Sequence, residues 1–143
     1  MKTNAKITII LVDDHKLIRE TWKFLLEQEE KFTVIAECDR GDIAVQKAKE
    51  LSPDIMLMDI NMSPINGFEA TKRITQEVPN VKVIGMSINN QPSYAKNMIQ
   101  VGAKGYVTKN STREEMIEAI LEVWNGNEYI CREIKDKMNN NHV

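Results

Sequence analysis

Cysteine and histidine are scarce in this chain, and long apolar runs are missing. Its 143 residues include two cysteines and two histidines. Cys38 and Cys131 stand far apart and match no metal-binding or redox spacing, so we expect buried or incidental thiols. No apolar stretch approaches the roughly 18 residues that are needed to span a bilayer. We therefore expect no membrane segment.

A dominant charge of one sign is also missing. The chain has 19 basic and 21 acidic side chains and a net charge of −2, which gives no general attraction to nucleic acid or to an anionic membrane. The N-terminus, MKTNAKITIILVDDH, ends its short apolar run in two acids rather than in small residues that could be cleaved. We interpret it as a first strand and not as a signal peptide. These features predict a cytoplasmic protein of one domain.

Short apolar segments rich in β-branched residues alternate with segments of helical periodicity. Strands are expected at residues 6–12, 32–37, 54–58, 81–86 and 104–108. Helices are expected around residues 18–26, 41–51, 68–77, 92–101 and 111–125. This alternation predicts βαβ units with right-handed crossovers. The expected fold class is α/β, a doubly wound, flavodoxin-like parallel sheet of five strands in the order 2-1-3-4-5.

The last helix has signals at both of its ends. Ser111, with Glu114 three residues later, has the spacing of a capping box, and Gly126 is suited to end the helix. Residues 127–143 are polar and weakly patterned. We therefore expect one domain over residues 1–126, followed by a frayed extension or the start of a linker.

Polar side chains follow the carboxyl ends of the expected strands. In an open parallel sheet, ligands bind beyond these ends, at the point where the strand order reverses; here that point lies between strands 1 and 3. Strand 1 ends at Asp13 and Asp14, strand 3 at Asp59, strand 4 at Ser87, and strand 5 just before Lys109. Three carboxylates, a hydroxyl and an ammonium group are therefore expected on one face.

This set of groups suits phosphate chemistry. Carboxylates at such short range raise one another's pKa unless a cation shares the site, and Mg²⁺ prefers carboxylate, carbonyl, water and phosphate oxygens. One carboxylate can act as a nucleophile and form an aspartyl phosphate. The metal and Lys109 can neutralise the oxygens of the transferred group, while Ser87 can donate a hydrogen bond to it.

Each residue taken alone has a simpler interpretation. Asp59 alone is more often a helix cap, and an acidic pair before a helix favours the helix dipole. Ser87 and Lys109 alone would be ordinary surface residues. His15, a single histidine beside two acids at the start of a helix, is more often solvated. Only the coincidence of five suitable residues at successive strand ends favours a site.

The sequence resembles the receiver domain of bacterial two-component response regulators in four segments, which read ILVDDH, DIMLMDINMSPINGFEA, VIGMSI and GAKGYVTK. The segments occur in the family's order and cover the chain from about Lys6 to Trp124. The DDH start and the segments GYVTKNSTREEMIEAI and GNEYICREI are most similar to the NarL/FixJ subgroup. Members of that subgroup carry LuxR-type DNA-binding domains.

The resemblance implies roles for the phosphate-binding and switch residues. Asp59 matches the phosphoacceptor, and Lys109 matches the lysine that pairs with the phosphoryl group. Ser87 matches the switch hydroxyl. Tyr106 matches the aromatic residue that turns inward when this hydroxyl is drawn to the phosphoryl group, although a partly exposed strand residue is its simpler interpretation.

The resemblance also implies a set of Mg²⁺ ligands. Asp14 would bind the ion directly and Asp13 mainly through water. Asp59 and the backbone carbonyl of Asn61 would complete the protein ligands. The side chains of Asn61 and Asn89 are candidates for tuning the rate of dephosphorylation by controlling the access of water.

The implied function is that of a switch, not of an enzyme that turns over external substrates. A histidine kinase would deliver its phosphoryl group to Asp59, and the receiver would catalyse its own phosphorylation and dephosphorylation. The surface of helix 4, strand 5 and helix 5 would then change, and a partner or a second copy of the chain would dock there. The expected output is control of transcription through a DNA-binding domain that this chain lacks.

The loop after Asp59 departs from the family pattern. The family usually has proline four residues after the phosphoacceptor, whereas this chain has Ser63 there and Pro64 next. Because the Gly67 position is unchanged, the loop keeps its length. We expect its backbone to differ locally, while Asp59 and the carbonyl of Asn61 stay in place.

Two further departures lie near the end of the chain. Asn110 follows Lys109 where the family often has proline, which leaves the geometry of that peptide bond open. A LuxR-type helix-turn-helix would need roughly 60 more residues. The chain is therefore either a stand-alone receiver that acts by protein–protein interaction or a fragment of a longer regulator, and we favour the fragment.

Three rival functions make different demands on the sequence. A hydrolase with an aspartyl-phosphate intermediate generally has a second acid shortly after the nucleophile, and Asn61 cannot act as one. A flavin-binding module would need a hydroxyl-rich and glycine-rich loop after strand 1, where this chain has DDHKLIR. A degenerate receiver that serves only as a docking surface is disfavoured by the complete set of five site residues.

Overall fold

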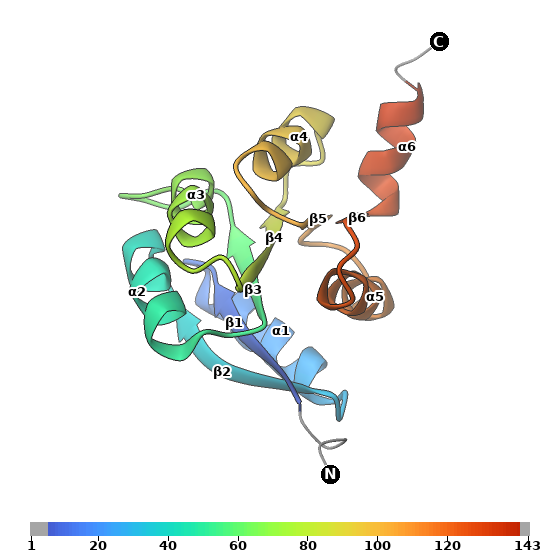
Figure 1. The fold of residues 1–143 in the computed structure, drawn as a ribbon. Coiled ribbons are helices and arrows are strands. Elements are labelled where there is room, and N and C mark those ends of the chain that lie inside the picture. Colours follow the sequence, from blue (N-terminus) through green and yellow to red (C-terminus); the bar gives the residue numbers. More distant parts are fainter. Residues whose placement is uncertain (1–5, 141–143) are drawn as a thin grey trace.

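The computed structural model of this chain describes residues 6–140 (Figure 1). They form a six-stranded sheet in the order β2-β1-β3-β4-β5-β6, with every neighbouring pair parallel. The strands are β1 (Ile7–Val12), β2 (Phe32–Cys38), β3 (Ile55–Asp59), β4 (Lys82–Ser87), β5 (Gly105–Thr108) and β6 (Tyr129–Ile130). The helices are α1 (Lys16–Glu27), α2 (Gly41–Leu51), α3 (Gly67–Glu77), α4 (Pro92–Gln100), α5 (Arg113–Trp124) and α6 (Arg132–Asn140).

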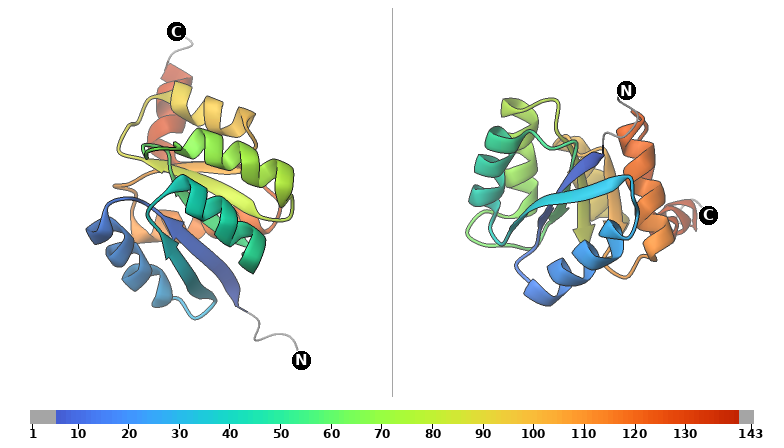
Figure 2. Two further views of the ribbon diagram at one scale, coloured as in Figure 1. Left: turned by 90° about the vertical axis from the view of Figure 1, so that its left-hand side faces the viewer. Right: turned by 90° about the horizontal axis from the view of Figure 1, so that it is seen from below.

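Helices cover both faces of the sheet (Figure 2). Helices α2, α3 and α4 lie on one face, and α1 and α5 lie on the other. Helix α6 lies beside α4 at the β6 edge (Figure 1). Because both faces of the central strands are covered, these strands read as continuous apolar runs rather than as alternating ones. Among residues 6–140, no helix combines the length and the apolar character needed to cross a bilayer.

Strand β3 lies at the centre of the sheet, between β1 and β4. All five of its residues are buried, and the apolar run before Asp59 packs between the two helical layers. Burial of a large apolar side chain stabilises the fold by roughly 2 kcal/mol relative to its exposure. The apolar run therefore fixes the strand firmly, and with it the carboxylate at its end.

The expected α/β class and the order 2-1-3-4-5 are confirmed for the first five strands, but the expectation of only five strands is wrong. Residues 129–140, expected to fray, form β6 and α6. Strand β6 pairs with the edge of β5, where Tyr129 N donates to Lys104 O and Cys131 N donates to Tyr106 O. Cys131 and Ile134 are fully buried. Residues 141–143 lie outside the described part of the chain.

The cap of α5 also differs from the expected one. Thr112, and not Ser111, is the N-cap residue, and its hydroxyl accepts a hydrogen bond from the backbone of Glu115 at 3.0 Å. The hydroxyl of Ser111 lies 3.4 Å from the hydroxyl of Thr108. Two neighbouring residues of capping type precede this helix, and the hydroxyl of the first lies near Thr108 at the end of β5 instead of capping the helix.

Both cysteines are free thiols buried in the apolar interior, as expected. Cys38 ends β2, and burial raises the pKa of its thiol to about 11. Burial likewise raises the pKa of the Cys131 thiol. Thiols with raised pKa values are poor nucleophiles at neutral pH, so both cysteines are packing residues.

Candidate functional site

An acidic pocket lies at the carboxyl ends of the central strands. Asp13 directly follows β1, Asp59 is the last residue of β3, and Ser87 is the last residue of β4. Lys109 directly follows β5. Because all these strands are parallel, their carboxyl ends share one edge of the sheet. The side chains expected at this edge from the sequence therefore lie together.

The ammonium group of Lys109 lies between two buried carboxylates. Its Nζ atom is 2.8 Å from Oδ2 of Asp13 and 3.3 Å from Oδ2 of Asp59. Asp13 and Asp59 are both fully buried. A buried carboxylate that loses its partner is strongly disfavoured, so the charge of Lys109 offsets part of the cost of burying these two carboxylates.

The carboxyl group of Asp59 has an unusual ionisation equilibrium. Burial is the main cause that raises its pKa, to about 6, and the negative charge of Asp13 acts in the same direction. The backbone N–H of Asn61 donates to Oδ1 of Asp59 at 3.1 Å. This hydrogen bond and the charge of Lys109 lower the pKa and offset part of the shift. Additional positive charge near Asp59 would favour its ionised form.

His15 is exposed to solvent, as expected, but one nitrogen of its ring also contacts this pocket. Its Nδ1 atom lies 2.8 Å from Oδ1 of Asp13, 3.1 Å from Oδ1 of Asp14 and 3.3 Å from Nζ of Lys109. The side chain is nevertheless 58% exposed. Its position directly after the acidic pair was the signal in the sequence that could have identified it, because the chain turns into α1 at that point.

The pocket has a donor set that fits a divalent cation. One ligand atom from each of four side chains lies within 4.8 Å of the others; the four are Asp13, Asp14, His15 and Asp59. The Oδ2 atoms of Asp13 and Asp59 are buried and accept no hydrogen bond from the described residues. Buried oxygens without a donor are costly unless a cation satisfies them. The residues present therefore fit a hard or borderline divalent ion.

The hydroxyl of Ser87 connects the pocket to the loop after β4. Its Oγ atom accepts hydrogen bonds from Nδ2 of Asn61 at 3.2 Å and from the backbone N–H of Asn89 at 2.9 Å. Asn61 and Asn89, which the sequence suggested as rate-tuning residues, thus both contact Ser87. The hydroxyl of Ser87 therefore links Asn61 in the pocket to the backbone of the β4–α4 loop.

Tyr106 is fully buried, so the simpler interpretation of it as a partly exposed strand residue is wrong. Its hydroxyl donates a long hydrogen bond of 3.5 Å to the carbonyl of Asn89. Burial raises the pKa of this phenol to about 12. Gly85 makes room for the ring, because a Cβ atom at that position would lie 2.9 Å from Cδ1 of Tyr106.

The loop between β3 and α3 passes close beneath Asp59. A Cβ atom on Gly67 would lie 2.3 Å from the backbone oxygen of Asp59, so only glycine fits there. Asn66 caps α3 by accepting a hydrogen bond from the backbone of Glu69. The Ser63–Pro64 bond is the only cis peptide bond within residues 6–140, so the bond between Lys109 and Asn110 is trans. The position of the Asn61 carbonyl stays a prediction.

Residues 9–121 match the family model of the response regulator receiver domain. The chain belongs to this family. The receiver has a relative in the transcriptional regulatory protein DegU of Brevibacillus brevis, which is 42% identical over 125 residues. The response regulator GacA of Pseudomonas aeruginosa is 35% identical over 132 residues. These matches take in 87% and 92% of this chain but only 53% and 62% of the two relatives.

Solved receiver structures have the same fold. A LuxR-family two-component response regulator from Aurantimonas superposes with a TM-score of 0.92 and 29% identity, covering 96% of this chain and 99% of that chain. The signal receiver domain of the response regulator NarL from Mycobacterium tuberculosis superposes with a TM-score of 0.82 and 28% identity, covering 86% of this chain and 99% of that chain. The resemblance to the NarL/FixJ subgroup is therefore confirmed, together with the receiver fold.

Proposed function

We propose that this receiver domain is a phosphorylation-controlled switch and that Asp59 accepts the phosphoryl group from a phosphohistidine of a histidine kinase. The observation that carries the proposal is the arrangement of Lys109 between Asp13 and Asp59, with their Oδ2 atoms 2.8 and 3.3 Å from its Nζ atom. A nucleophile, a fixed cation and an acidic metal pocket are thereby present within one site.

The transfer needs an ionised Asp59. A carboxylate oxygen of Asp59 attacks phosphorus, the bond between phosphorus and the imidazole nitrogen of the donor breaks, and the nitrogen keeps the electron pair. Lys109 then pairs with the oxygens of the transferred group, and the hydroxyl of Ser87 donates a hydrogen bond to one of them. The hydrogen bond from the N–H of Asn61 holds the carboxylate in a fixed orientation throughout.

Mg²⁺ is the proposed cofactor, and it would be held by Asp13, Asp14, Asp59 and the backbone carbonyl of Asn61. The unsatisfied Oδ2 atoms of Asp13 and Asp59 support this assignment. When bound, the ion supplies positive charge that offsets the charge of the phosphoryl oxygens. Hydrolysis of the aspartyl phosphate would occur at the same site, with Asn61 and Asn89 limiting the access of water.

The switch would act through the β4–α4 loop. Ser87 moves toward the phosphoryl group, and the backbone of Asn89, which donates to its hydroxyl, follows. The carbonyl of Asn89 accepts the hydrogen bond from the Tyr106 hydroxyl, so the Tyr106 ring and the β4–α4 loop would respond together. The result is a change of the α4–β5–α5 surface, biased by contacts that differ between the two states.

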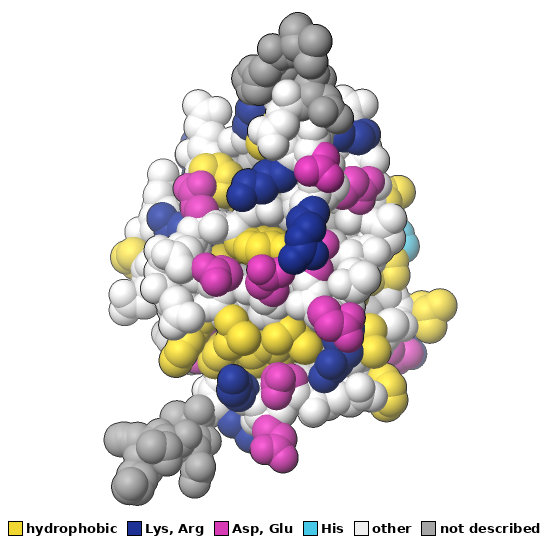
Figure 3. All heavy atoms as spheres, turned by 90° about the vertical axis from the view of Figure 1, so that its right-hand side faces the viewer, with side chains coloured by type: hydrophobic (Ala, Val, Ile, Leu, Met, Phe, Trp, Pro, Cys, Tyr) yellow, Lys and Arg dark blue, Asp and Glu magenta, His cyan; other side chains and the backbone are white. Residues whose placement is uncertain are grey.

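In this structure the chain's own C-terminal segment partly covers that surface. Strand β6 pairs with β5, and α6 contacts α4. Figure 3 shows this side of the molecule, where side chains of both charges lie above a band of hydrophobic ones. A partner or a second copy that docks on α4–β5–α5 would have to include α6 in its interface or displace it.

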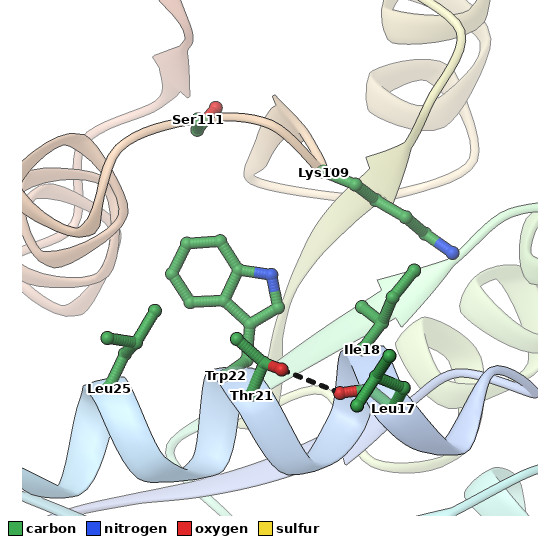
Figure 4. A pocket seen from close by; sticks show the side chains of 7 residues that line it. All are labelled: Leu17, Ile18, Thr21, Trp22, Leu25, Lys109 and Ser111. Atoms are coloured by element: carbon green, nitrogen blue, oxygen red, sulfur yellow. Dashed lines mark hydrogen bonds between the residues drawn. The ribbon is translucent and has the colours of Figure 1, made fainter.

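The proposed docking face for the kinase lies beside the pocket, over α1. A hollow of about 310 Å³ lies between α1 and the segment after β5 (Figure 4). Lys109 forms part of its lining, and Leu17 on its rim is 75% exposed. Phe24, further along α1, is 67% exposed. An apolar surface at the entrance to the site suits a partner that must present a phosphohistidine there.

The biological output is proposed from the relatives. DegU is named as a transcriptional regulatory protein, and the matches to this chain leave a large part of each relative uncovered. We propose that the receiver controls transcription in the cytoplasm through a DNA-binding domain in a longer protein. A stand-alone receiver that acts by protein–protein contact is the alternative. An aspartyl-phosphate hydrolase is disfavoured, because Asn61 supplies an amide where such an enzyme needs an acid.

Phosphorylation with a small donor tests the proposal. The protein incubated with Mg²⁺ and radiolabelled acetyl phosphate should incorporate one acid-stable, base-labile phosphoryl group. Asp59→Ala should abolish incorporation, while the control Asp39→Ala, at an exposed acid, should retain it. Undiminished labelling of Asp59→Ala would show that another residue is the phosphoacceptor.

A further inference from the structure

The imidazole of His15 contacts the acidic pocket, yet the switch described above makes no use of it. Its Nδ1 atom approaches two carboxylates, at 2.8 Å from Oδ1 of Asp13 and at 3.1 Å from Oδ1 of Asp14. The rest of the ring faces solvent, because more than half of the side chain is exposed. The nitrogen is thus placed at the mouth of the pocket, on the same side as the acids.

The distances from Nδ1 of His15 to the two carboxylate oxygens match the distances between neighbouring ligand atoms around an octahedral cation. Bonds of about 2.1 Å at right angles place adjacent ligand atoms about 3 Å apart. A nitrogen that meets this condition with two carboxylate oxygens can share a metal ion with both of them after only a small adjustment.

A second feature of the pocket points to a cation independently. Oδ2 of Asp13 and Oδ2 of Asp59 are buried in fully buried side chains and accept no hydrogen bond from the described residues. Lys109 approaches both oxygens but leaves them without a well-directed donor. Further positive charge close to the nitrogen of His15 would therefore stabilise these two oxygens.

We propose that His15 is a metal ligand through Nδ1 and that it shifts the preference of the pocket from Mg²⁺ toward borderline divalent ions such as Co²⁺ and Ni²⁺. Mg²⁺ takes oxygen ligands and gains little from an imidazole, whereas later first-row ions bind imidazole well. A pocket of three carboxylates and one imidazole discriminates among these ions more strongly than carboxylates alone. The inference rests on the proposed function for the identity of the metal pocket.

A different role for the ring makes the opposite prediction. If His15 only hydrogen-bonds Asp13 and closes the pocket, the ring must leave before any cation enters. Its removal would then tighten the binding of Mg²⁺ and Ni²⁺ alike. The two roles are distinguished by the change in relative affinity for the two ions.

Calorimetric titration of the full chain, prepared without a histidine tag, measures this change. His15→Gln keeps a polar side chain but removes the imidazole, and His142→Gln, at the only other histidine, is the matched control. We expect His15→Gln to weaken Ni²⁺ binding at the acidic pocket by about ten-fold or more and Mg²⁺ binding by less than about two-fold. His142→Gln should leave the ratio of the two affinities unchanged.

Pulsed electron paramagnetic resonance of bound Mn²⁺ gives a direct readout. An imidazole ligand produces nuclear modulation from its nitrogen, so the signal should be present in the wild type and in His142→Gln and absent in His15→Gln. An unchanged Ni²⁺ to Mg²⁺ ratio, tighter binding of both ions, or no nitrogen modulation in the wild type would each overturn the assignment of His15. Absence of Mg²⁺ binding in the wild type would instead contradict the proposed function, since Ni²⁺ and Mn²⁺ test His15 separately.

Discussion

Asn90, in the loop after β4, donates a hydrogen bond of 2.6 Å to the carboxylate of Glu133 on α6, 43 residues later in the chain. The same side chain accepts a hydrogen bond of 2.9 Å from Lys137, one turn further along α6. Glu133 also accepts a hydrogen bond from Thr108, at the end of β5. The β4–α4 loop is therefore hydrogen-bonded directly to α6.

Replacing Asn90 should loosen α6 without unfolding the domain. Asn90→Ala removes both hydrogen bonds to α6, which are exposed and together stabilise the native state by roughly 1 kcal/mol. Amide hydrogen exchange over residues 132–140 should accelerate several-fold, whereas exchange in β3 should not change. The matched control is Asn127→Ala, which removes a bond to Glu122 and leaves α6 tied. Equal protection of α6 in Asn90→Ala and the wild type would contradict the role of these bonds.

The phosphoryl mimic beryllofluoride with Mg²⁺ should have a similar effect on the wild type. Movement of Ser87 toward the mimic displaces Asn89, which donates to its hydroxyl, and Asn90 lies next in the chain. Exchange over α6 should therefore increase on addition of the mimic. Ser87→Ala should bind the mimic but show little change in α6, because the link from pocket to loop is lost. A full response of α6 in Ser87→Ala would refute this route.

The position of the pocket was predictable from the sequence because only backbone topology and strand ends were needed. The apolar segments before Asp59 and Ser87 are unambiguous, and a parallel sheet brings their carboxyl ends to one edge. The packing of the residues around the pocket was harder to predict from the sequence. The burial of Tyr106 depends on which tertiary neighbours leave space for its ring, as Gly85 does, and no local pattern encodes that.

The C-terminal segment was missed for a different physical reason. Strand β6 has two residues, too few to produce a period of two. Cys131 and Ile134 are buried, but polar and charged residues separate them and predominate from Arg132 onward, so the segment resembles a solvated extension. Pairing with the free edge of β5 makes it structured, and an unpaired edge is a property of the folded sheet.

Binding of the mimic should raise thermal stability. A ligand that binds only the native state at 100 times its dissociation constant adds about 2.7 kcal/mol to the free energy of unfolding. The melting temperature should therefore rise by several degrees with Mg²⁺ and beryllofluoride together. Lys109→Ala should lose most of this rise, since the mimic no longer meets the ammonium group. Removal of Mg²⁺ with a chelator should reverse it, and a rise that persists in the chelator would place the mimic elsewhere.

Alkaline pH should destabilise the protein through Cys38. Burial raises the pKa of this thiol from 9.0 to about 11 in the folded state. The unfolded chain loses the thiol proton first, so the contribution to stability is complete below pH 9 and is lost as pH rises toward 11. The free energy of unfolding should fall by about 2 kcal/mol over this window from this group. Cys38→Ala should show a smaller fall, measured by urea unfolding at each pH; an equal fall would assign the effect to other groups.

Gly67→Ala should displace Asp59 and thereby weaken the binding of Mg²⁺ in the pocket. The added Cβ atom would lie 2.3 Å from the backbone oxygen of Asp59 and 2.6 Å from Cα of Ile60, so the loop or the end of β3 must move. Overpacking of this kind costs roughly 1 to 3 kcal/mol, and the displacement falls on the residue that carries the nucleophile. We expect both a lower melting temperature and weaker binding of Mg²⁺ by the folded variant, measured by titration well below its melting temperature.

Gly126→Ala is a useful control, because no atom lies within 4 Å of its Cβ position, although its φ of +96° is also strained for alanine. If both variants lose stability but only Gly67→Ala loses Mg²⁺ affinity, the close approach of Gly67 to Asp59 is what positions the carboxylate; equal Mg²⁺ affinities would show that the strand end tolerates the shift.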